Sequence, residues 1–560
     1  MIDQLRNAVG HKNVLTGTNR TAYFRSGFRS GKGGAAAVVF PKTLKQFWET
    51  LKVCVKAQSA IIIQAAKTGL TEGSCPSGSE YGRDVVIINV TGIKKIILLD
   101  DGKQAIVFPG TTLHELTQVL QTVGRTPHSV IGSTSIGATV IGGIANNSGG
   151  ALCKLGSAYT ELALFAKVDA QGELHLIDHL SINGLGDTPE DIFATLESGN
   201  VSSWDVQGDD RLASDREYKE RIRDLDATIP NRYNADPSRL FEVSGSGGKV
   251  AAFAVRVDTY PAPKKKKVFY LGTNDRDRLV ALRRDVLEDF DELPDMCEYL
   301  SQSVFDTASR YGKDVFLSIK YLGTKNLPRA YALKSAVEYR LNKIPFLPKY
   351  LPDQFLYFLS RFFPNHLPKR LLNFRDKFEH HLIISTSDDG IDEMAHYLES
   401  WRDQGDGEYF ECTEQEQSAA LLHRFAAAGA AIRYQTLHQR TTEEVLALDI
   451  ALLGNDSQWL EDLPPEVTKH LELELYYGHY ICHVFHQDLI FKKGTDIEAI
   501  KMQILHRLDE KGAKYPAEHN VGHMYQAEDD LRRFYEELDP TNTFNPGIGK
   551  TSKGPRLRLT

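Results

Sequence analysis

Histidines are the residues of this chain best suited to acid–base or metal chemistry. Three stand close together, His479, His483 and His486. On a helix they would share one face, whereas on a single strand His486 would point away from the other two. A fourth, His519, follows Glu518 in the segment YPAEHNVGH. Because an unperturbed imidazole has a pKa of about 6.5, His519 is the candidate general base.

Arginines offer the cation that a carboxylate substrate would require. The guanidinium group is planar and binds a carboxylate through two parallel hydrogen bonds. Arg424 and Arg433 lie in LLHRFAAAGAAIRYQ, where nearly every other residue is small or apolar, so an unpaired charge there would be costly. Arg29 and Arg375 are further candidates. For each of these arginines, a structural ion pair is the alternative interpretation.

Glycine-rich segments in the first 150 residues favour a phosphate-bearing or planar cofactor. The loop 64–74, QAAKTGLTEGS, follows a strand-like run, and successive N–H groups in such a turn form an anion nest. The segment 127–150 carries six glycines among small apolar residues. The segment 27–36 matches G-x-G-x-x-A, but it does not join a strand to a helix, so it does not predict a Rossmann site. A plain tight loop and a buried glycine-rich turn remain the structural alternatives for the other two.

The elements that must position these groups alternate between strands and helices. This alternation predicts mixed α/β layers up to about residue 260. Strand-like runs cover 35–40, 60–65, 84–90 and 104–108, and helical spacing covers 42–58 and 111–124. The polar, acidic stretch 181–235 predicts a surface insertion, after which 241–263 returns to a strand.

The segment 325–379 has a different character. It carries eleven Lys and Arg residues against four Asp and Glu residues, interleaved with aromatic residues and six prolines. Basic charge mixed with aromatic side chains is typical of a protein that lies on an anionic membrane surface. Buried core helices are the main alternative. A nucleic-acid patch is a weaker one, because no nucleic-acid motif accompanies the segment.

Composition describes an ordinary globular protein and excludes several classes. The 560 residues carry a net charge of −8, which argues against a basic nucleic-acid-binding protein. Six scattered cysteines without a C-x-x-C pair indicate reduced thiols. We find no signal-peptide pattern at the start and no apolar run of roughly 18 residues. We therefore expect a protein kept in the cytoplasm or attached to a membrane from that side.

The order of the glycine-rich segments resembles that of a known family. After 64–74 and 127–150 come SGSGGKV (244–250) and DPTNTFNPGIGK (539–550). This order is similar to that in the FAD-linked 2-hydroxyacid dehydrogenases of the vanillyl-alcohol-oxidase type. The resemblance implies an α+β fold, with a two-subdomain PCMH-type FAD-binding domain, an α+β cap domain and an inserted basic membrane-binding element.

That resemblance also implies domain limits and cofactor residues. We expect the FAD-binding domain in 1–258 completed by 510–560, the cap domain in 259–300, 378–415 and 440–509, and the membrane-binding element in 301–377 and 416–439. The FAD would be non-covalent, since loop 64–74 has neither His nor Cys. Its expected contacts are Ala65, Ala66, Lys67, Thr68, Gly69, Gly73, Ser74, Gly132, Thr139, Gly149 and Ala252.

Within this superfamily the chain most resembles the membrane-associated, quinone-dependent D-lactate dehydrogenases. The stretches YYGHYICHVFHQD and YPAEHNVGH, with the basic-aromatic segment, carry the resemblance. It implies oxidation of D-lactate through FAD to ubiquinone or menaquinone, on the cytoplasmic face of the inner membrane as a peripheral protein. The alternatives are a soluble FAD-dependent dehydrogenase of another D-2-hydroxy acid (2-hydroxyglutarate or glycolate), a non-enzymatic membrane-surface binding protein, and a nucleotide-sugar reductase of the same superfamily. No nucleic-acid partner is expected.

The resemblance assigns roles to the residues introduced above. Glu518 and His519 match the family's E-H segment, in which the His lies near the flavin, while Asn520 departs from the family's Gly. Metal-dependent relatives use a pattern that His479, His486 and Glu518 reproduce, which implies a zinc or manganese site. The family's G-D-G-N is replaced here by ICHVF. Without a metal, these histidines would bind the substrate directly or donate hydrogen bonds in the pocket.

Overall fold

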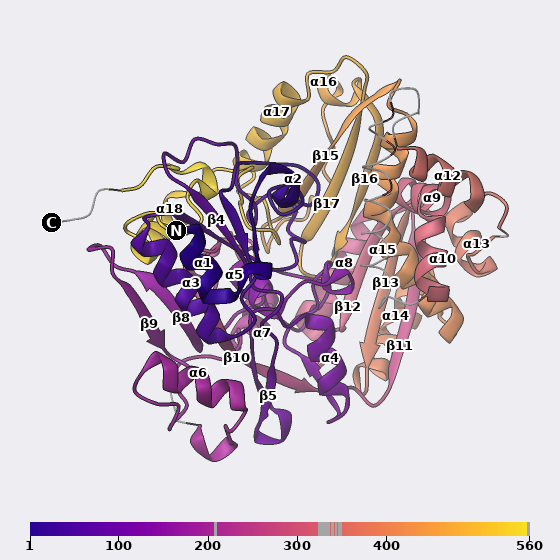
Figure 1. The fold of residues 1–560 in the computed structure, drawn as a ribbon. Coiled ribbons are helices and arrows are strands. Elements are labelled where there is room, and N and C mark those ends of the chain that lie inside the picture. Colours follow the sequence, from indigo (N-terminus) through magenta and orange to yellow (C-terminus); the bar gives the residue numbers. More distant parts are fainter. Residues whose placement is uncertain are drawn as a thin grey trace.

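The computed structural model describes residues 1–206, 210–322, 350–363 and 365–556, together with Val337, Leu341 and Ile344. Six of the eleven basic residues of the segment 325–379, those between positions 325 and 349, lie outside the described residues. The fold is α+β, with two sheets in the N-terminal half and a third in the C-terminal half (Figure 1).

The first sheet forms from the strand-like runs that the sequence predicts. Its order is β1 (Val14–Leu15), β2 (Ala37–Val39), β4 (Val85–Asn89) and β3 (Ala60–Gln64), with β2, β4 and β3 parallel. Helix α3 (Leu44–Lys56) begins at Thr43, whose side chain accepts a hydrogen bond from the backbone N–H of Gln46. The loop 64–74 therefore leaves the carboxyl end of a buried parallel strand.

The second sheet is antiparallel and packs beside the first. Its order is β5 (Ile96–Leu99), β6 (Gln104–Val107), β10 (Ala251–Pro261), β8 (Ala163–Val168) and β9 (Leu174–Asp178), and β7 (Arg125–Pro127) also pairs with β10. Helices α1 (Ile2–Val9), α4 (Leu113–Gln121), α5 (Val140–Ala145) and α6 (Pro189–Ser198) accompany the two sheets.

The expected surface insertion at 181–235 is wrong. Helix α6 buries Ile192, Phe193 and Leu196 in the core between the first two sheets. Further along, Tyr218 and Ile222 of α7 (Tyr218–Arg223) join the core of the C-terminal half. Most residues of the stretch are polar, but the apolar residues that it does contain attach it to both hydrophobic cores.

The third sheet has seven strands and is sandwiched between helices. Its order is β14 (Glu408–Glu411), β11 (Lys266–Thr273), β13 (His380–Ser387), β12 (Met296–Ser301), β16 (Leu471–His479), β17 (Val484–Lys492) and β15 (Thr442–Ala451). All its pairings are antiparallel. The assignment of sheets to the proposed domain limits stays a prediction.

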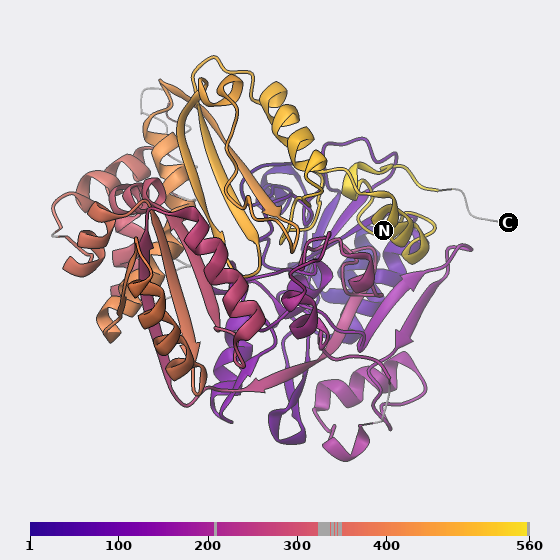
Figure 2. The ribbon, with the colours of Figure 1, turned by 180° about the vertical axis from the view of Figure 1, so that it is seen from behind.

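Two helical layers cover this sheet (Figures 1 and 2). On one face lie α8 (Arg276–Asp289), α14 (Gly390–Asp403) and α17 (Ile497–Glu510). On the other lie α9 (Gln302–Tyr311), α10 (Lys313–Leu322), α13 (Lys369–Lys377) and the long α15 (Glu414–Leu437), with α12 (Leu351–Ser360) outside them. The chain then returns to the N-terminal half through α18 (Asp529–Leu538), where the main chain of Asn545 bonds to Ile61.

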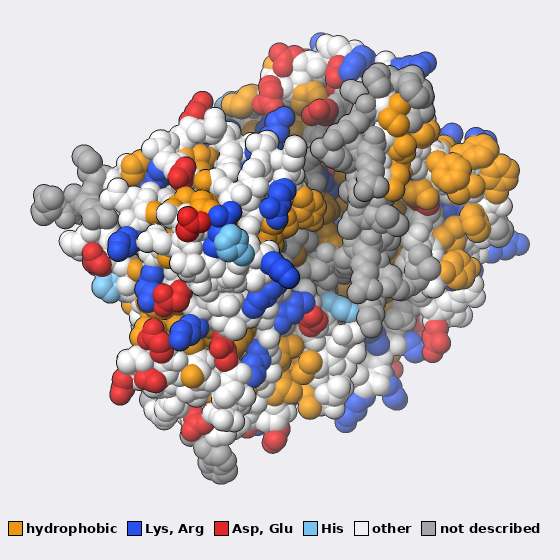
Figure 3. Space-filling view, in the orientation of Figure 1, with side chains coloured by type: hydrophobic (Ala, Val, Ile, Leu, Met, Phe, Trp, Pro, Cys, Tyr) orange, Lys and Arg blue, Asp and Glu red, His pale blue; other side chains and the backbone are white. Residues whose placement is uncertain are grey.

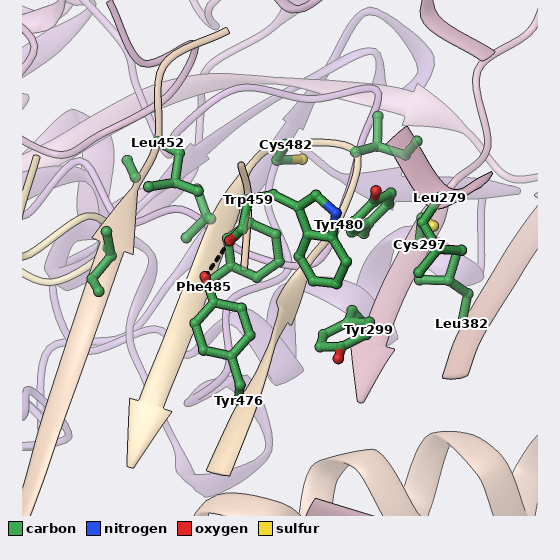
Figure 4. Close-up of a cluster of buried hydrophobic side chains, with 14 of the residues drawn as sticks. Leu279, Cys297, Tyr299, Leu382, Leu452, Trp459, Tyr476, Tyr480, Cys482 and Phe485 are labelled. Carbon is green, nitrogen blue, oxygen red and sulfur yellow. Dashed lines mark hydrogen bonds between the residues drawn. The ribbon is translucent and has the colours of Figure 1, made fainter. Parts of the chain in front are cut away.

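An aromatic cluster packs against one face of the hairpin β16–β17 (Figure 4). Trp459 packs against Tyr299 and Phe485, and its carbonyl accepts a hydrogen bond of 2.6 Å from the hydroxyl of Tyr476. Strand side chains alternate between faces, so the neighbouring Tyr477 points the opposite way. The face turned away from this cluster is the one that carries the candidate site.

The described part of the basic-aromatic segment divides into exposed and packed side chains. On and just after α12, Phe355, Phe358, Phe362 and Phe363 are 53–72% exposed, so the buried-helix alternative is wrong for them. Several basic groups are paired instead: Arg370 with Glu416, Arg375 with Asp306 and Lys377 with Glu408. Among the described helices, none combines the length and apolar content needed to cross a membrane.

Candidate active site between the two halves

A cavity of about 1580 Å³ separates the glycine-rich loops from the third sheet and α15. Its size exceeds the roughly 300–1,000 Å³ typical of small-molecule pockets, so it has room for a dinucleotide and a small substrate. All eleven predicted cofactor residues line it, from Ala65 to Ala252. So do all the predicted catalytic and metal residues: Arg424, Arg433, His479, His486, Glu518 and His519.

The loop walls fit an extended cofactor. A Cβ atom built on Gly69 or on Gly132 would meet nothing within 4 Å, so both backbones face open space. Lys67 is different, because its ammonium group is held by the carbonyl oxygens of Tyr23 and Ser26. Burial lowers the pKa of Lys67 to about 8. This lysine therefore ties the loop to residues 23–26 rather than reaching toward a phosphate.

The three histidines that are close in sequence lie on the hairpin formed by β16 and β17. His479 ends β16 and His486 lies in β17, while His483 forms the turn with a positive φ of 53°. His483 is buried and its Nδ1 contacts the carbonyl of Leu453 at 2.9 Å, away from the cavity. The three histidines therefore lie neither on one helix nor on one strand, and His479 and His486 meet, with ring centroids 5.5 Å apart.

Strand register supplies each of these histidines with a carboxylate. Glu298 of β12 lies directly opposite His479, and Asp449 of β15 lies directly opposite His486. The Glu298 Oε1 to His479 Nδ1 distance is 2.6 Å, and the Asp449 Oδ1 to His486 Nδ1 distance is 3.3 Å. Two acids therefore flank two histidines across four neighbouring strands.

A chain of buried charges runs through this row. Arg424 Nε lies 2.7 Å from Glu298 Oε2, and the Arg424 guanidinium stacks on the ring of Tyr477. His479 Nε2 lies 3.1 Å from Glu518 Oε2. The other oxygen of Glu518 accepts a 2.7 Å hydrogen bond from Arg232. Each buried charge thus has an opposite charge beside it, which such a site requires.

These neighbours decide the protonation states. Burial disfavours the imidazolium of His479, but Glu298 and Glu518 outweigh burial and raise its pKa to about 10. Burial would raise the pKa of Glu518, but His479 and Arg232 lower it to about 2. The pKa of Glu298 is likewise lowered, despite burial, by His479 and Arg424.

His519 has the geometry of an oriented base. Its Nδ1 lies 2.5 Å from Asp449 Oδ2, which also accepts a hydrogen bond of 2.7 Å from the backbone N–H of Glu518. With Nδ1–H directed at the carboxylate, Nε2 is left to accept a proton. Burial lowers the pKa of His519, but the charge of Asp449 outweighs burial and raises it.

Two residues that follow this base, Asn520 and His523, make structural contacts. The side chain of Asn520 accepts a hydrogen bond from the backbone N–H of Gly522 and donates one to the hydroxyl of Tyr535. His523 Nδ1 contacts the carbonyl of Gly547 at 3.0 Å. Asn520, which replaces the family's Gly, is therefore held by hydrogen bonds of its own side chain.

The predicted metal set is brought together. His479, His486 and Glu518 each offer one ligand atom, and these atoms lie within 4.8 Å of one another. Because Nδ1 of each histidine lies against a carboxylate, its other nitrogen is left for a ligand, as in most histidine metal sites. The donors fit zinc or manganese.

The candidate arginines separate in space. Arg424 and Arg433 are nine positions apart on α15, about 13 Å along the helix axis. Arg433 bonds to Asp314 at 3.0 Å and to Asp353 at 2.8 Å, so it joins α15 to α10 and α12. Arg375 pairs with Asp306 on α9. Arg29 lines the cavity and makes no ion pair or hydrogen bond to the described residues, which leaves it available.

Three residues of the site, Glu298, Asp449 and Arg232, were not predicted from the sequence. A signal existed for two of them, since Glu298 in CEYLS and Asp449 in ALDIA are acids within otherwise apolar strands. Such a charge is costly unless paired, which marks it for attention. Arg232 carried no comparable signal, because it lies in the polar stretch interpreted as surface.

The chain matches two protein families and several solved structures. The family described as "D-lactate dehydrogenase, membrane binding" matches residues 268–556, and the family described as "FAD binding domain" matches residues 35–178. The p-cresol methylhydroxylase structure aligns with a TM-score of 0.57 at 12% identity, over 98% of this chain and 96% of that chain. Alkyldihydroxyacetonephosphate synthase aligns with a TM-score of 0.57 at 13% identity, over 97% and 84%. At such identities these structures establish the fold alone.

Two relatives are much closer in sequence. The quinone-dependent D-lactate dehydrogenase of Escherichia coli K12 is 51% identical over 99% of this chain and 96% of its own length. That of Haemophilus influenzae is 50% identical over 99% of this chain and 98% of its own length. With such identity along the whole chain, and with the membrane-binding family covering more than half of it, this chain belongs to the family of quinone-dependent D-lactate dehydrogenases.

Proposed function

We propose that this protein oxidises D-lactate to pyruvate with FAD and passes the electrons to a membrane quinone. The observation that carries the proposal is the arrangement on one cavity wall: an imidazole oriented by Asp449 and a guanidinium at Arg424 face the glycine-rich loops. The family to which the chain belongs has this same activity in its name.

The oxidation removes a hydride from C2 of the substrate and a proton from its hydroxyl group. Residues 65–74 and 132–149 would hold FAD non-covalently, and the bound flavin would supply the hydride acceptor. His519 Nε2 takes the hydroxyl proton, and Asp449 stabilises the resulting imidazolium. Arg424 holds the carboxylate of the substrate, with Glu298 and Tyr477 fixing its guanidinium.

Of the two candidate arginines on α15, Arg433 is the weaker ligand for the carboxylate of the substrate. Both of its ion pairs are to carboxylates of neighbouring helices. We therefore propose Arg424 for the clamp and assign Arg433 to the joining of α15 with α10 and α12. Arg29 is an additional cation for the substrate or for the phosphates of the cofactor.

A divalent ion, zinc or manganese, would be held by His479, His486 and Glu518. There it would act as a Lewis acid toward the oxygen atoms of the substrate. Its binding requires that His479 give up the proton it shares with Glu518, since a ligand imidazole must be neutral. Metal analysis of the purified protein, before and after dialysis against a chelator, tests this site.

The membrane contact is proposed at α12 and the chain that follows it. Its exposed phenylalanines, with Arg361 and Lys369 exposed nearby, favour a peripheral position on an anionic surface. We propose the cytoplasmic face of the inner membrane, with ubiquinone or menaquinone as the acceptor.

The experiment that tests this proposal isolates flavin reduction by the substrate. The FAD-loaded protein is mixed anaerobically with D-lactate, L-lactate or D-2-hydroxyglutarate, and the flavin absorbance is followed. We expect bleaching by D-lactate, with the other two substrates much slower. A rate with D-2-hydroxyglutarate equal to that with D-lactate would contradict the proposed substrate.

A further inference from the structure

Helix α15 is apolar on two opposite faces. One face packs on the third sheet through Ala420, Ala427 and Ala431, all buried. The other face lines the cavity through residues spaced four, three, one and three apart, which places them in one stripe: Leu421, Phe425, Ala428, Gly429 and Ile432. A helix at the surface of a soluble protein normally carries polar residues there.

Two side chains of this second stripe are substantially exposed, while Leu421 and Ala428 also pack against the core beside the sheet. Phe425 is 38% exposed and Ile432 is 40% exposed. Between them, a Cβ atom built on Gly429 would meet nothing within 4 Å, and the backbone there does not have a positive φ. The helix therefore does not need glycine at this position for its conformation. What the glycine provides is a flat gap between two apolar side chains.

The gap lies on a path between the reaction site and the proposed membrane contact. At one end of the stripe, Arg424 reaches Glu298 of the charged row. At the other end, the same cavity is bordered by Val315 of α10 and Asp353 of α12. The outer side of α12 carries the exposed phenylalanines, which gather on one side of the molecule (Figure 3).

We propose that this apolar wall of α15 is the binding site of the quinone acceptor, whose planar ring lies over Gly429 between Phe425 and Ile432. The inference rests on the proposed function, in which D-lactate is the reductant. Two electrons and two protons pass to the two carbonyl oxygens of the quinone, which becomes the quinol, and the flavin returns to its oxidised form. An apolar planar ligand delivered from a bilayer matches both the chemistry of the stripe and its position.

A gap-filling variant tests the site by kinetics. Gly429→Leu places a side chain where the ring would lie, while Gly429→Ala is the matched control with a single methyl group. Both replacements suit a helix interior better than glycine does, so folding is preserved. We expect Gly429→Leu to slow reoxidation of the reduced flavin by a short-chain ubiquinone by roughly tenfold or more. Flavin reduction by D-lactate should stay within about twofold.

The outcomes of this experiment are distinct. Unchanged reoxidation by the quinone in Gly429→Leu would overturn the site. An equal slowing of flavin reduction would also overturn it, because the wall would then be a shared entrance. Failure of D-lactate to reduce the flavin in the parent protein would instead contradict the proposed function.

A binding measurement gives a readout that does not depend on turnover. All six native cysteines are buried, so an introduced surface thiol can be labelled selectively. In Ile432→Cys we expect the short-chain ubiquinone, whose ring is fully substituted and does not alkylate thiols, to slow labelling several-fold. The control is Val123→Cys at an exposed turn of the N-terminal half, where no protection is expected. If the labelling rate of Ile432→Cys is the same with and without the quinone, the proposal is overturned.

Discussion

Replacement of His519 by glutamine tests the central step of the proposed reaction. The 2.5 Å contact with Asp449 fixes Nδ1 and leaves Nε2 as the proton acceptor. Glutamine can still donate a hydrogen bond to Asp449, but it cannot take a proton at neutral pH. The lost contribution of general-base catalysis is a factor of about 10²–10⁴, or about 2.7–5.4 kcal/mol of barrier.

The assay is anaerobic stopped-flow reduction of the bound flavin by D-lactate, so that reoxidation does not enter. The flavin spectrum and the thermal unfolding midpoint serve as checks that the variant is folded and loaded. His523→Gln is the matched control, because His523 lies four residues away and its ring contacts the carbonyl of Gly547 rather than a carboxylate. We expect the control to reduce the flavin at nearly the parent rate.

A second variant distinguishes loss of a base from a shift of the loop. His519→Ala opens space for an added imidazole, which should restore part of the rate in proportion to its neutral form. A rate for His519→Gln within about tenfold of the parent, or the absence of any imidazole rescue, would refute the assignment of His519 as the base.

Four further results are expected. Asp449→Asn removes the charge that raises the pKa of His519, so the acid limb of the pH profile for flavin reduction should move to lower pH. Arg232→Met removes one of two cationic partners of the buried Glu518 and leaves His479 beside it, so it should lower the free energy of unfolding by about 3 kcal/mol in urea denaturation, and Arg232→Lys should lower it less. Burial lowers the pKa of His381 and of His423 to about 3, whereas both sit near 6.5 when unfolded, so stability should be lost as the pH falls from about 6.5 toward 3 in acid denaturation followed by circular dichroism. Replacing the exposed phenylalanines of α12 by serine should weaken sedimentation with anionic liposomes.

Much of the cavity wall was predictable from the sequence. The loops at 64–74 and 127–150 are local features, and small residues next to a buried strand limit where the backbone can go. All eleven expected cofactor residues consequently line the cavity. The strands β3 and β4 and the helix α4 were predicted for the same reason, since periodicity is a local signal, whereas helix α1 and strand β5 were not predicted.

The partners of the reactive groups were decided by tertiary structure. Glu298 and His479 are separated by 181 residues, and Arg232 and Glu518 by 286. Their contacts depend on which strands become neighbours and in which register, and a shift by one residue would turn every side chain to the other face. The turn at His483 is a further example, because it converts one run of histidines into two strands.

The sequence by itself therefore determined the family, the cofactor-binding loops and the candidate base, because these depend on residue types at short spacing. Tertiary structure alone decided that Asp449 orients His519, that Arg433 is held by two carboxylates and that α15 turns an apolar stripe into the cavity. The physical reason is that charge pairing and exposure are properties of the assembled sheet and helices, not of any segment taken alone.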